Sequence, residues 1–206
     1  MKYFLLCALW FLWCFLHSWL VSTGTSAWFK KRLGKKYAFY RIFYNLFALI
    51  TVLPLLYWQH TLTGQIVIPL SPELMIFKYA AFIFSIMVIA GAFFTFDVRE
   101  FAGIRKMGAG DQQREKEPVI RKHGLYGIVR HPMYFGGIIF LASSMVHAPL
   151  PQFLGYSILV IYMIIGTVRE DRRLARELGK IYRDYQEEVP MIIPRLPWKM
   201  GSGNRA

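Results

Sequence analysis

Two short clusters of ionisable residues are the strongest candidates for chemistry in this sequence. Arg130 and His131 stand directly before Pro132, and Glu170 and Asp171 form a second pair further along the chain. Proline suits the first position of a helix because its missing N–H would be unpaired there, and the free N–H groups of a first turn attract anions. His131 can exchange a proton near neutral pH, and Glu170 can orient a hydroxyl or cationic group. The sequence therefore predicts a candidate site in which a basic pair faces an acidic pair.

A helical hairpin must bring these two pairs together. Two apolar runs, residues 132–147 and 152–168, are joined by the connection 148–151, which contains two prolines. Because both ends of a hairpin return to one side, we expect the basic pair beside the acidic pair at one membrane interface. The first run is slightly short of the roughly 20 residues that cross a bilayer, so the hairpin should reach to, or nearly to, the far face. The two pairs then form either a salt bridge that only closes the hairpin or a polar pocket that borders an apolar one.

The composition is that of a membrane protein. Of the 206 residues, 55% are hydrophobic and 17% aromatic, the mean hydropathy is +0.35, and the apolar residues come in long runs. Besides the hairpin, residues 3–21, 39–58 and 74–96 are long enough to span a bilayer. We therefore expect an all-α integral membrane protein, residues 1–206, with about five transmembrane helices in a single domain.

The net charge of +13 is concentrated in a few places. Apart from Lys2 and Lys78, every Lys and Arg falls within residues 30–41, 99–130 or 169–205, between or after apolar runs. This pattern is typical of multi-pass proteins with basic cytoplasmic segments, and it predicts an outer N-terminus and a cytoplasmic C-terminus in a bacterial inner membrane. The basic segments also attract anionic lipids, so the lipid bilayer is an expected partner. No nucleic-acid-binding signature accompanies the charge, and nucleic acid is not an expected partner.

Other polar residues occur near the predicted membrane surface. His17 and Ser18 are either a packed polar pair or part of the wall of a pocket at headgroup level. From Arg169 onward, charged residues alternate with apolar ones at helical spacing. This predicts an amphipathic helix that lies against the membrane or against the protein's own cytoplasmic face, with a break or close contact at Gly179. The two cysteines share one face of an apolar run, so we expect buried thiols, and no metal site is predicted.

Two blocks of sequence carry a family resemblance. The first is Gly124-Leu125-Tyr126 with Val129-Arg130-His131-Pro132-Met133-Tyr134, and the second is Arg169-Glu170-Asp171 with Leu178-Gly179-x-x-Tyr182-x-x-Tyr185 and Val189-Pro190. In this order and separation they resemble the isoprenylcysteine carboxyl methyltransferase superfamily, which also contains phospholipid N-methyltransferases. The N-terminal half, with His17-Ser18, Tyr44-Asn45 and residues 97–103, is similar to the bacterial branch of methanethiol S-methyltransferases.

The resemblance implies a cofactor and a set of site residues. Members of that superfamily use S-adenosylmethionine, which the resemblance would place here between segments 119–137 and 169–190. The implied cofactor-binding residues are Val119, Gly124, Tyr126, Arg130, His131, Tyr134, Glu170 and Asp171, of which His131, Glu170 and Arg130 are the catalytic candidates. This sequence departs from the usual Leu-Val before the glycine, because it has Ile120 and Arg121 there. Val119 can supply the expected apolar contact to adenine through a shift of one residue.

The expected function is S-adenosylmethionine-dependent methyl transfer to a lipophilic or membrane-dissolved acceptor. Methyl transfer from a sulfonium is an in-line displacement, so catalysis depends mostly on alignment and exclusion of water. The acceptor is a carboxyl, a thiol or an amine, and a thiol or amine must first lose a proton, for which His131 or Glu170 is suited. Two alternatives are a non-catalytic membrane accessory or transport protein, which would not bind the cofactor, and a membrane NADPH-dependent reductase, which would need a clear phosphate site.

Overall fold

The regular structure of the chain is helical wherever it is described. The computed structural model describes residues 1–95, 120 and 122–195. Its main helices are α1 (Lys2–Val21), α3 (Tyr40–Thr61), α4 (Met75–Thr95), α6 (Pro132–Met145) and α7 (Leu150–Leu178). The shorter elements are α2 (Thr23–Leu33), α8 (Lys180–Glu188) and 3-10 turns at Gly34–Phe39, Pro72–Leu74 and Gly124–Gly127. The prediction of an all-α fold is confirmed.

Four helical segments are long and apolar enough to cross a membrane. They are Lys2–Val21, Ile42–Thr61, Pro72–Phe94 and Leu150–Leu178, whereas Pro132–Met145 is a shorter apolar helix. Many of their large apolar side chains point outward, as Phe4, Phe77 and Ile161 do with 81%, 69% and 58% exposure. A water-soluble protein would bury such side chains, so these surfaces face lipid. The chain is an integral membrane protein, as its sequence predicts.

The hairpin forms, but its second helix is longer than the apolar run. Pro132 occupies the start of α6, as its missing N–H favours. α7 continues for 29 residues without a break, from Leu150 through the charged residues to Leu178. The prediction that a separate amphipathic helix starts at Arg169 is therefore wrong, because this segment extends the membrane helix. The predicted break lies at Gly179, whose φ of 60° suits glycine, and the amphipathic helix is the short α8 that follows.

Small residues let the helices approach closely at two places. A Cβ on Gly136 of α6 would lie 3.1 Å from the carbonyl oxygen of Ser85, which shows how near α4 runs. On α7, a Cβ on Gly155 would lie 1.8 Å from Gln59 Oε1, which accepts a 2.7 Å hydrogen bond from Trp10 Nε1. Gln59 and Trp10 are fully buried, so this contact joins α1, α3 and α7 inside the apolar layer.

Backbone hydrogen bonds tie the α3–α4 connection to the turn between α6 and α7. Leu150 N–H donates to the carbonyl of Gln65 at 2.9 Å, and His147 N–H donates to the carbonyl of Ile68 at 2.9 Å. Val67 N–H donates to the carbonyl of Ala148 at 3.2 Å. These bonds join the two connections to one another at the end of the bundle beyond α6.

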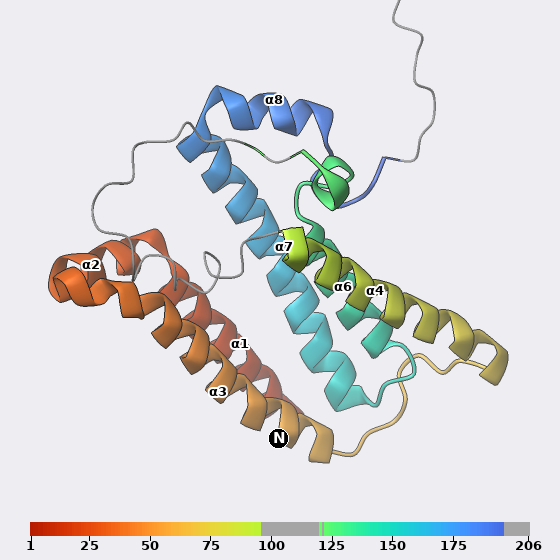
Figure 1. Cartoon of the computed structure of the whole chain (residues 1–206). Coiled ribbons are helices and arrows are strands. Elements are labelled where there is room, and N and C mark those ends of the chain that lie inside the picture. The colour runs from red at the N-terminus through yellow and green to blue at the C-terminus, as the bar shows by residue number, and fades with distance from the viewer. Residues whose placement is uncertain (96–119, 121, 196–206) are drawn as a thin grey trace, which may run out of the picture.

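The ends of the bundle differ in character (Figure 1). The α6–α7 turn, the α3–α4 connection and the N-terminus lie at one end, and α2 and the charged end of α7 with α8 lie at the other. The basic segments within the described residues therefore gather at one end, which is also where the two predicted site clusters are.

Candidate functional site

The carboxylate of Asp171 is the centre of a buried hydrogen-bond network. Arg130 binds it with both arms of the guanidinium, because Nε donates to Oδ1 and Nη2 donates to Oδ2, each at 2.9 Å. His131 Nε2 lies 3.0 Å from Oδ1, the Tyr182 hydroxyl donates to Oδ1 at 2.8 Å, and Gln186 Nε2 donates to Oδ2 at 2.7 Å. The side chains of Arg130 and Asp171 are only 8% and 9% exposed. Such a bidentate, enclosed ion pair fixes the relative positions of the segments that carry it.

Arg130 also fastens the chain that follows α8. Its Nη1 donates to the carbonyls of Val189 and Gln186, and its backbone N–H donates to the carbonyl of Pro190 at 2.9 Å. The next backbone N–H, that of His131, donates to the carbonyl of Met191 at 3.1 Å. Three segments, namely the entry to α6, the charged end of α7 and the end of α8, are thus joined around one arginine.

The network determines the hydrogen positions on His131. A carboxylate that accepts from Arg130 can only accept from His131 as well, so Nε2 carries a hydrogen and, in the neutral ring, Nδ1 is the basic nitrogen. Burial lowers the pKa of His131 below its ordinary value, and this effect exceeds the opposing effect of the Asp171 carboxylate. The imidazole is therefore neutral at pH 7. No hydrogen bond among the described residues engages its Nδ1 atom.

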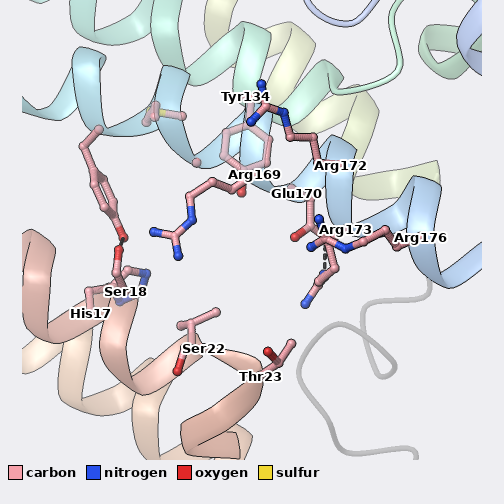
Figure 2. Close-up of a pocket in the computed structure, with 14 residues that line it drawn as sticks. His17, Ser18, Ser22, Thr23, Tyr134, Arg169, Glu170, Arg172, Arg173 and Arg176 are labelled. Atoms are coloured by element: carbon pink, nitrogen blue, oxygen red, sulfur yellow. Dashed lines mark hydrogen bonds and ion pairs between the residues drawn. The ribbon is translucent and has the colours of Figure 1, made fainter.

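A cavity of about 580 Å³ lies where α1 and α7 meet the first turn of α6. Tyr134 contributes from α6 and Glu170 from α7, and His17 and Ser18 line the opposite wall (Figure 2). The Ser18 hydroxyl donates to the hydroxyl of Tyr162 at 3.0 Å. Of the two readings of His17 and Ser18, pocket-lining is confirmed.

His17 and Glu170 differ in how the protein satisfies their polar atoms. His17 stacks on Trp13 with ring centroids 5.2 Å apart, and its buried Nδ1 atom has no hydrogen-bond partner. Glu170 accepts from Arg173 at 2.5 Å, one turn along the same helix. The cavity thus presents one carboxylate and several aromatic rings on surfaces that converge.

The structure separates the predicted site residues into two groups. Arg130, His131 and Asp171 belong to the buried network, whereas Tyr134 and Glu170 line the cavity. Adjacent residues on a helix point about 100° apart, and here Glu170 lines the cavity while Asp171 binds within the network. Asp171 alone makes the predicted salt bridge with the basic pair.

The remaining predicted residues lie close to the network or outside the described residues. Tyr126 offers its backbone carbonyl to the hydroxyl of Tyr185 at 2.5 Å, and Gly124 is exposed with a φ of +61° that suits glycine. Burial raises the pKa of Tyr185 to about 12, so its hydroxyl keeps its proton. Val119 and Arg121 lie outside the described residues, so their predicted roles at the adenine stay predictions.

Comparison with known proteins identifies the family. The family described as NnrU protein matches residues 5–194, nearly the whole chain. The chain belongs to the NnrU protein family. It is also similar to the methanethiol S-methyltransferase of Pseudomonas deceptionensis, with 37% identity over 107 residues, which is 50% of this chain and 39% of that protein.

Longer matches link most of the chain to the same group of relatives. Methanethiol S-methyltransferase 1 of Bradyrhizobium diazoefficiens is 28% identical over 86% of this chain and 62% of its own length. The Mycobacterium tuberculosis methanethiol S-methyltransferase is 28% identical over 86% of this chain and 72% of its own length. The first matches span under two-fifths of those relatives, at 37% and 39%. No solved structure matches. The predicted resemblance to the bacterial branch is confirmed.

Sequence reasoning missed parts of the site in this NnrU-family chain. Gln186 was not singled out, although it lies one turn after Tyr182 and both donate to Asp171. The i, i+4 spacing of these two residues on one face of a short helix was the available signal. Tyr162 was also missed, because a lone tyrosine inside an apolar run resembles ordinary core.

Proposed function

We propose that this chain is an integral-membrane S-adenosylmethionine-dependent methyltransferase with a lipophilic or membrane-dissolved acceptor. The observation that carries the proposal is that the two signature blocks, far apart in sequence, close on one another through Asp171. Beside this junction lies a cavity lined by Tyr134 and Glu170, one residue from each block. The relatives named as methanethiol S-methyltransferases support a methyl-transfer reaction.

The residues present fit the cofactor. When bound, S-adenosylmethionine supplies a methyl group already activated on a sulfonium. The ring faces of Tyr134 and Tyr162 suit a cationic centre, and the Glu170 carboxylate, which Arg173 already neutralises in part, lines the same cavity. A volume of about 580 Å³ is within the range of small-molecule sites. Among the predicted cofactor residues, Tyr134 and Glu170 are proposed to touch it directly.

The buried network has a supporting role in this proposal. Arg130, His131 and Asp171 hold the α8 segment against the hairpin, and the Tyr185 hydroxyl holds the turn at Gly124–Gly127 against α8, so that both blocks keep their positions around the cofactor. This closure also limits access of water, which favours transfer to the acceptor over side reactions. A thiol or amine acceptor must lose a proton, and the candidates are the Glu170 carboxylate and the Nδ1 atom of neutral His131.

Titration of the purified protein with S-adenosylhomocysteine tests cofactor use. We expect saturable heat of binding to the wild type and loss of most of it in Glu170→Gln, because the cavity carboxylate is replaced by a neutral amide. A folded sample that binds neither S-adenosylhomocysteine nor S-adenosylmethionine would refute the proposal. A transfer assay with labelled cofactor, offered a thiol, a prenylcysteine and a lipid amine in turn, then identifies the acceptor class.

We also propose that the N-terminus faces outward and the C-terminus faces the cytoplasm of a bacterial inner membrane. The gathering of α2 and α8 at one end of the bundle, opposite the N-terminus, supports this orientation (Figure 1). In a variant whose Cys7 and Cys14 are replaced by alanine, labelling of a single cysteine placed at Thr63 or at Arg183 with a membrane-impermeant maleimide on intact cells tests it. We expect labelling at Thr63 only, and labelling at Arg183 only would reverse the orientation.

A further inference from the structure

One face of the charged end of α7 consists of arginines. Arg169, Arg172, Arg173 and Arg176 follow at i, i+3, i+4 and i+7, a spacing that places side chains on one helical face, and all four line the cavity. Arg173 pairs with Glu170 at 2.5 Å and has Glu177 at 3.8 Å. Within the part of the chain that the structure describes, the other three make no ion pair. The cavity therefore has a strongly positive side that its own single carboxylate does not neutralise.

Hydroxyl and amide donors face these arginines from the other wall. Ser22 and Thr23 stand at the corner between α1 and α2 on the opposite side of the cavity, and Arg169 extends toward Ser18 (Figure 2). α2 begins at Thr23, so the free N–H groups of its first turn lie at this corner, and Ser22 caps one of them through Thr25 N–H at 3.3 Å. Guanidinium groups and backbone donors on two converging walls are the chemistry that binds phosphate.

The cavity lies where the apolar parts of α1 and α7 end, and its lining is amphiphilic. The apolar part of α7 ends at Val168 and that of α1 at Val21, so the arginines begin where both helices leave the apolar layer. Val21, Met163 and Gly166 add apolar surface to the lining. A ligand that matches both the arginines and the apolar lining would place a phosphate beside the arginines and a hydrocarbon chain toward the bilayer.

We propose that the arginine side of this cavity, formed by Arg169, Arg172 and Arg176, binds the phosphate of an anionic phospholipid headgroup. A freely solvated charged face would explain the arginines but not their arrangement around a cavity that continues into apolar surface. The site depends on the position of the cavity at the interface and does not rest on methyl transfer. Binding of the lipid is therefore measured without the cofactor.

Native mass spectrometry of the protein released from bilayers tests this site. The wild-type protein, reconstituted in phosphatidylcholine with a minor fraction of phosphatidylglycerol, should retain phosphatidylglycerol in preference to phosphatidylcholine. The double variant Arg169→Gln/Arg176→Gln should lose this preference by roughly tenfold or more, because two charge-assisted contacts to phosphate are removed. Lys180→Gln/Arg183→Gln is the matched control, since it also removes two exposed positive charges, here on α8, that make no ion pair among the described residues. Equal loss in the two double variants would show that only net charge matters and would overturn the proposal.

Two further arms separate the alternatives. Arg169→Lys/Arg176→Lys keeps both charges and should retain part of the preference for phosphatidylglycerol. This second variant keeps the test decisive even if the glutamine variant folds poorly. Glycerol 3-phosphate, which has the phosphate without acyl chains, should compete at least tenfold less well than short-chain phosphatidylglycerol. If glycerol 3-phosphate or inorganic phosphate displaces the lipid equally well, the site binds a free anion and the assignment to a lipid is wrong.

Discussion

Asp171→Asn tests whether the buried network holds α8 on the molecule. The substitution keeps the shape of the side chain but removes the charge that Arg130 pairs with at 2.9 Å in an environment where both side chains are less than a tenth exposed. Removing one partner of such a pair leaves a buried charge uncompensated and costs about 3–5 kcal/mol. The asparagine oxygen can still accept from Tyr182 or His131, which favours the lower end of that range. Because 1.4 kcal/mol is a factor of ten in an equilibrium, about 3 kcal/mol raises the open population of α8 roughly a hundredfold.

Trypsin cleavage within α8 measures that open population. Lys180 and Arg183 are exposed as residues, but cleavage requires the helix to open locally, so the cleavage rate follows the open fraction when reclosing is fast. We expect Asp171→Asn to be cleaved roughly a hundred times faster than the wild type. Asp184→Asn is the control, because Asp184 is an exposed acid on the same helix, and its effect should stay within about 0.5 kcal/mol. If Asp171→Asn is cleaved no more than about twice as fast as Asp184→Asn, a difference of about 0.5 kcal/mol, the carboxylate does not hold α8 and the reasoning fails.

Three other predictions concern pH, packing and turnover. Since the folded-state pKa of His131 lies below its ordinary value of 6.5, the unfolded chain binds more protons in acid, and stability should fall as pH drops below 6.5, with a smaller fall in His131→Gln. Gly155→Leu should destabilise the bundle by more than about 3 kcal/mol in thermal unfolding, because even a Cβ would lie 1.8 Å from Gln59 Oε1. Glu170→Gln should lower methyl-transfer turnover by roughly a hundredfold or more, while Glu177→Gln leaves it near the wild-type rate.

Each of these predictions has an outcome that contradicts it. An identical pH dependence in wild type and His131→Gln would show that another group causes the acid sensitivity. For packing, Gly24→Leu is the comparison, since a Cβ there meets nothing within 4 Å, and equal unfolding temperatures for the two glycine variants would remove the argument from close approach. Wild-type turnover in Glu170→Gln would exclude the cavity carboxylate from the reaction.

The hairpin and its polar end were predictable because they depend on local and topological rules. Apolar run lengths, Pro132 at a helix start and the return of a hairpin to one side were enough to bring Asp171 to Arg130 and His131. The break at Gly179 was equally accessible, since only glycine adopts its positive φ at little cost.

The detailed site was not predictable because one helix boundary was misplaced. When charged residues begin at Arg169, a sequence reading starts a new helix there, and the rotational register across the junction is lost. The continuous α7 fixes that register and places Arg169 and Arg176 on the cavity side. The docking of α8 depends on tertiary contacts with Arg130, which periodicity within nine residues does not specify.

The short α6 makes this protein sensitive to the thickness of its membrane. Its 14 residues are about 21 Å long, roughly 9 Å less than a typical hydrocarbon core. The paired connection beyond it carries Ile66, Val67 and Ile68, which are 43%, 39% and 41% exposed and can contact lipid. Hydrophobic mismatch at this one helix should therefore strain the pairing between the two connections in thick bilayers and relax it in thin ones. The length of the lipid acyl chains should therefore act on the end of the hairpin opposite the candidate site.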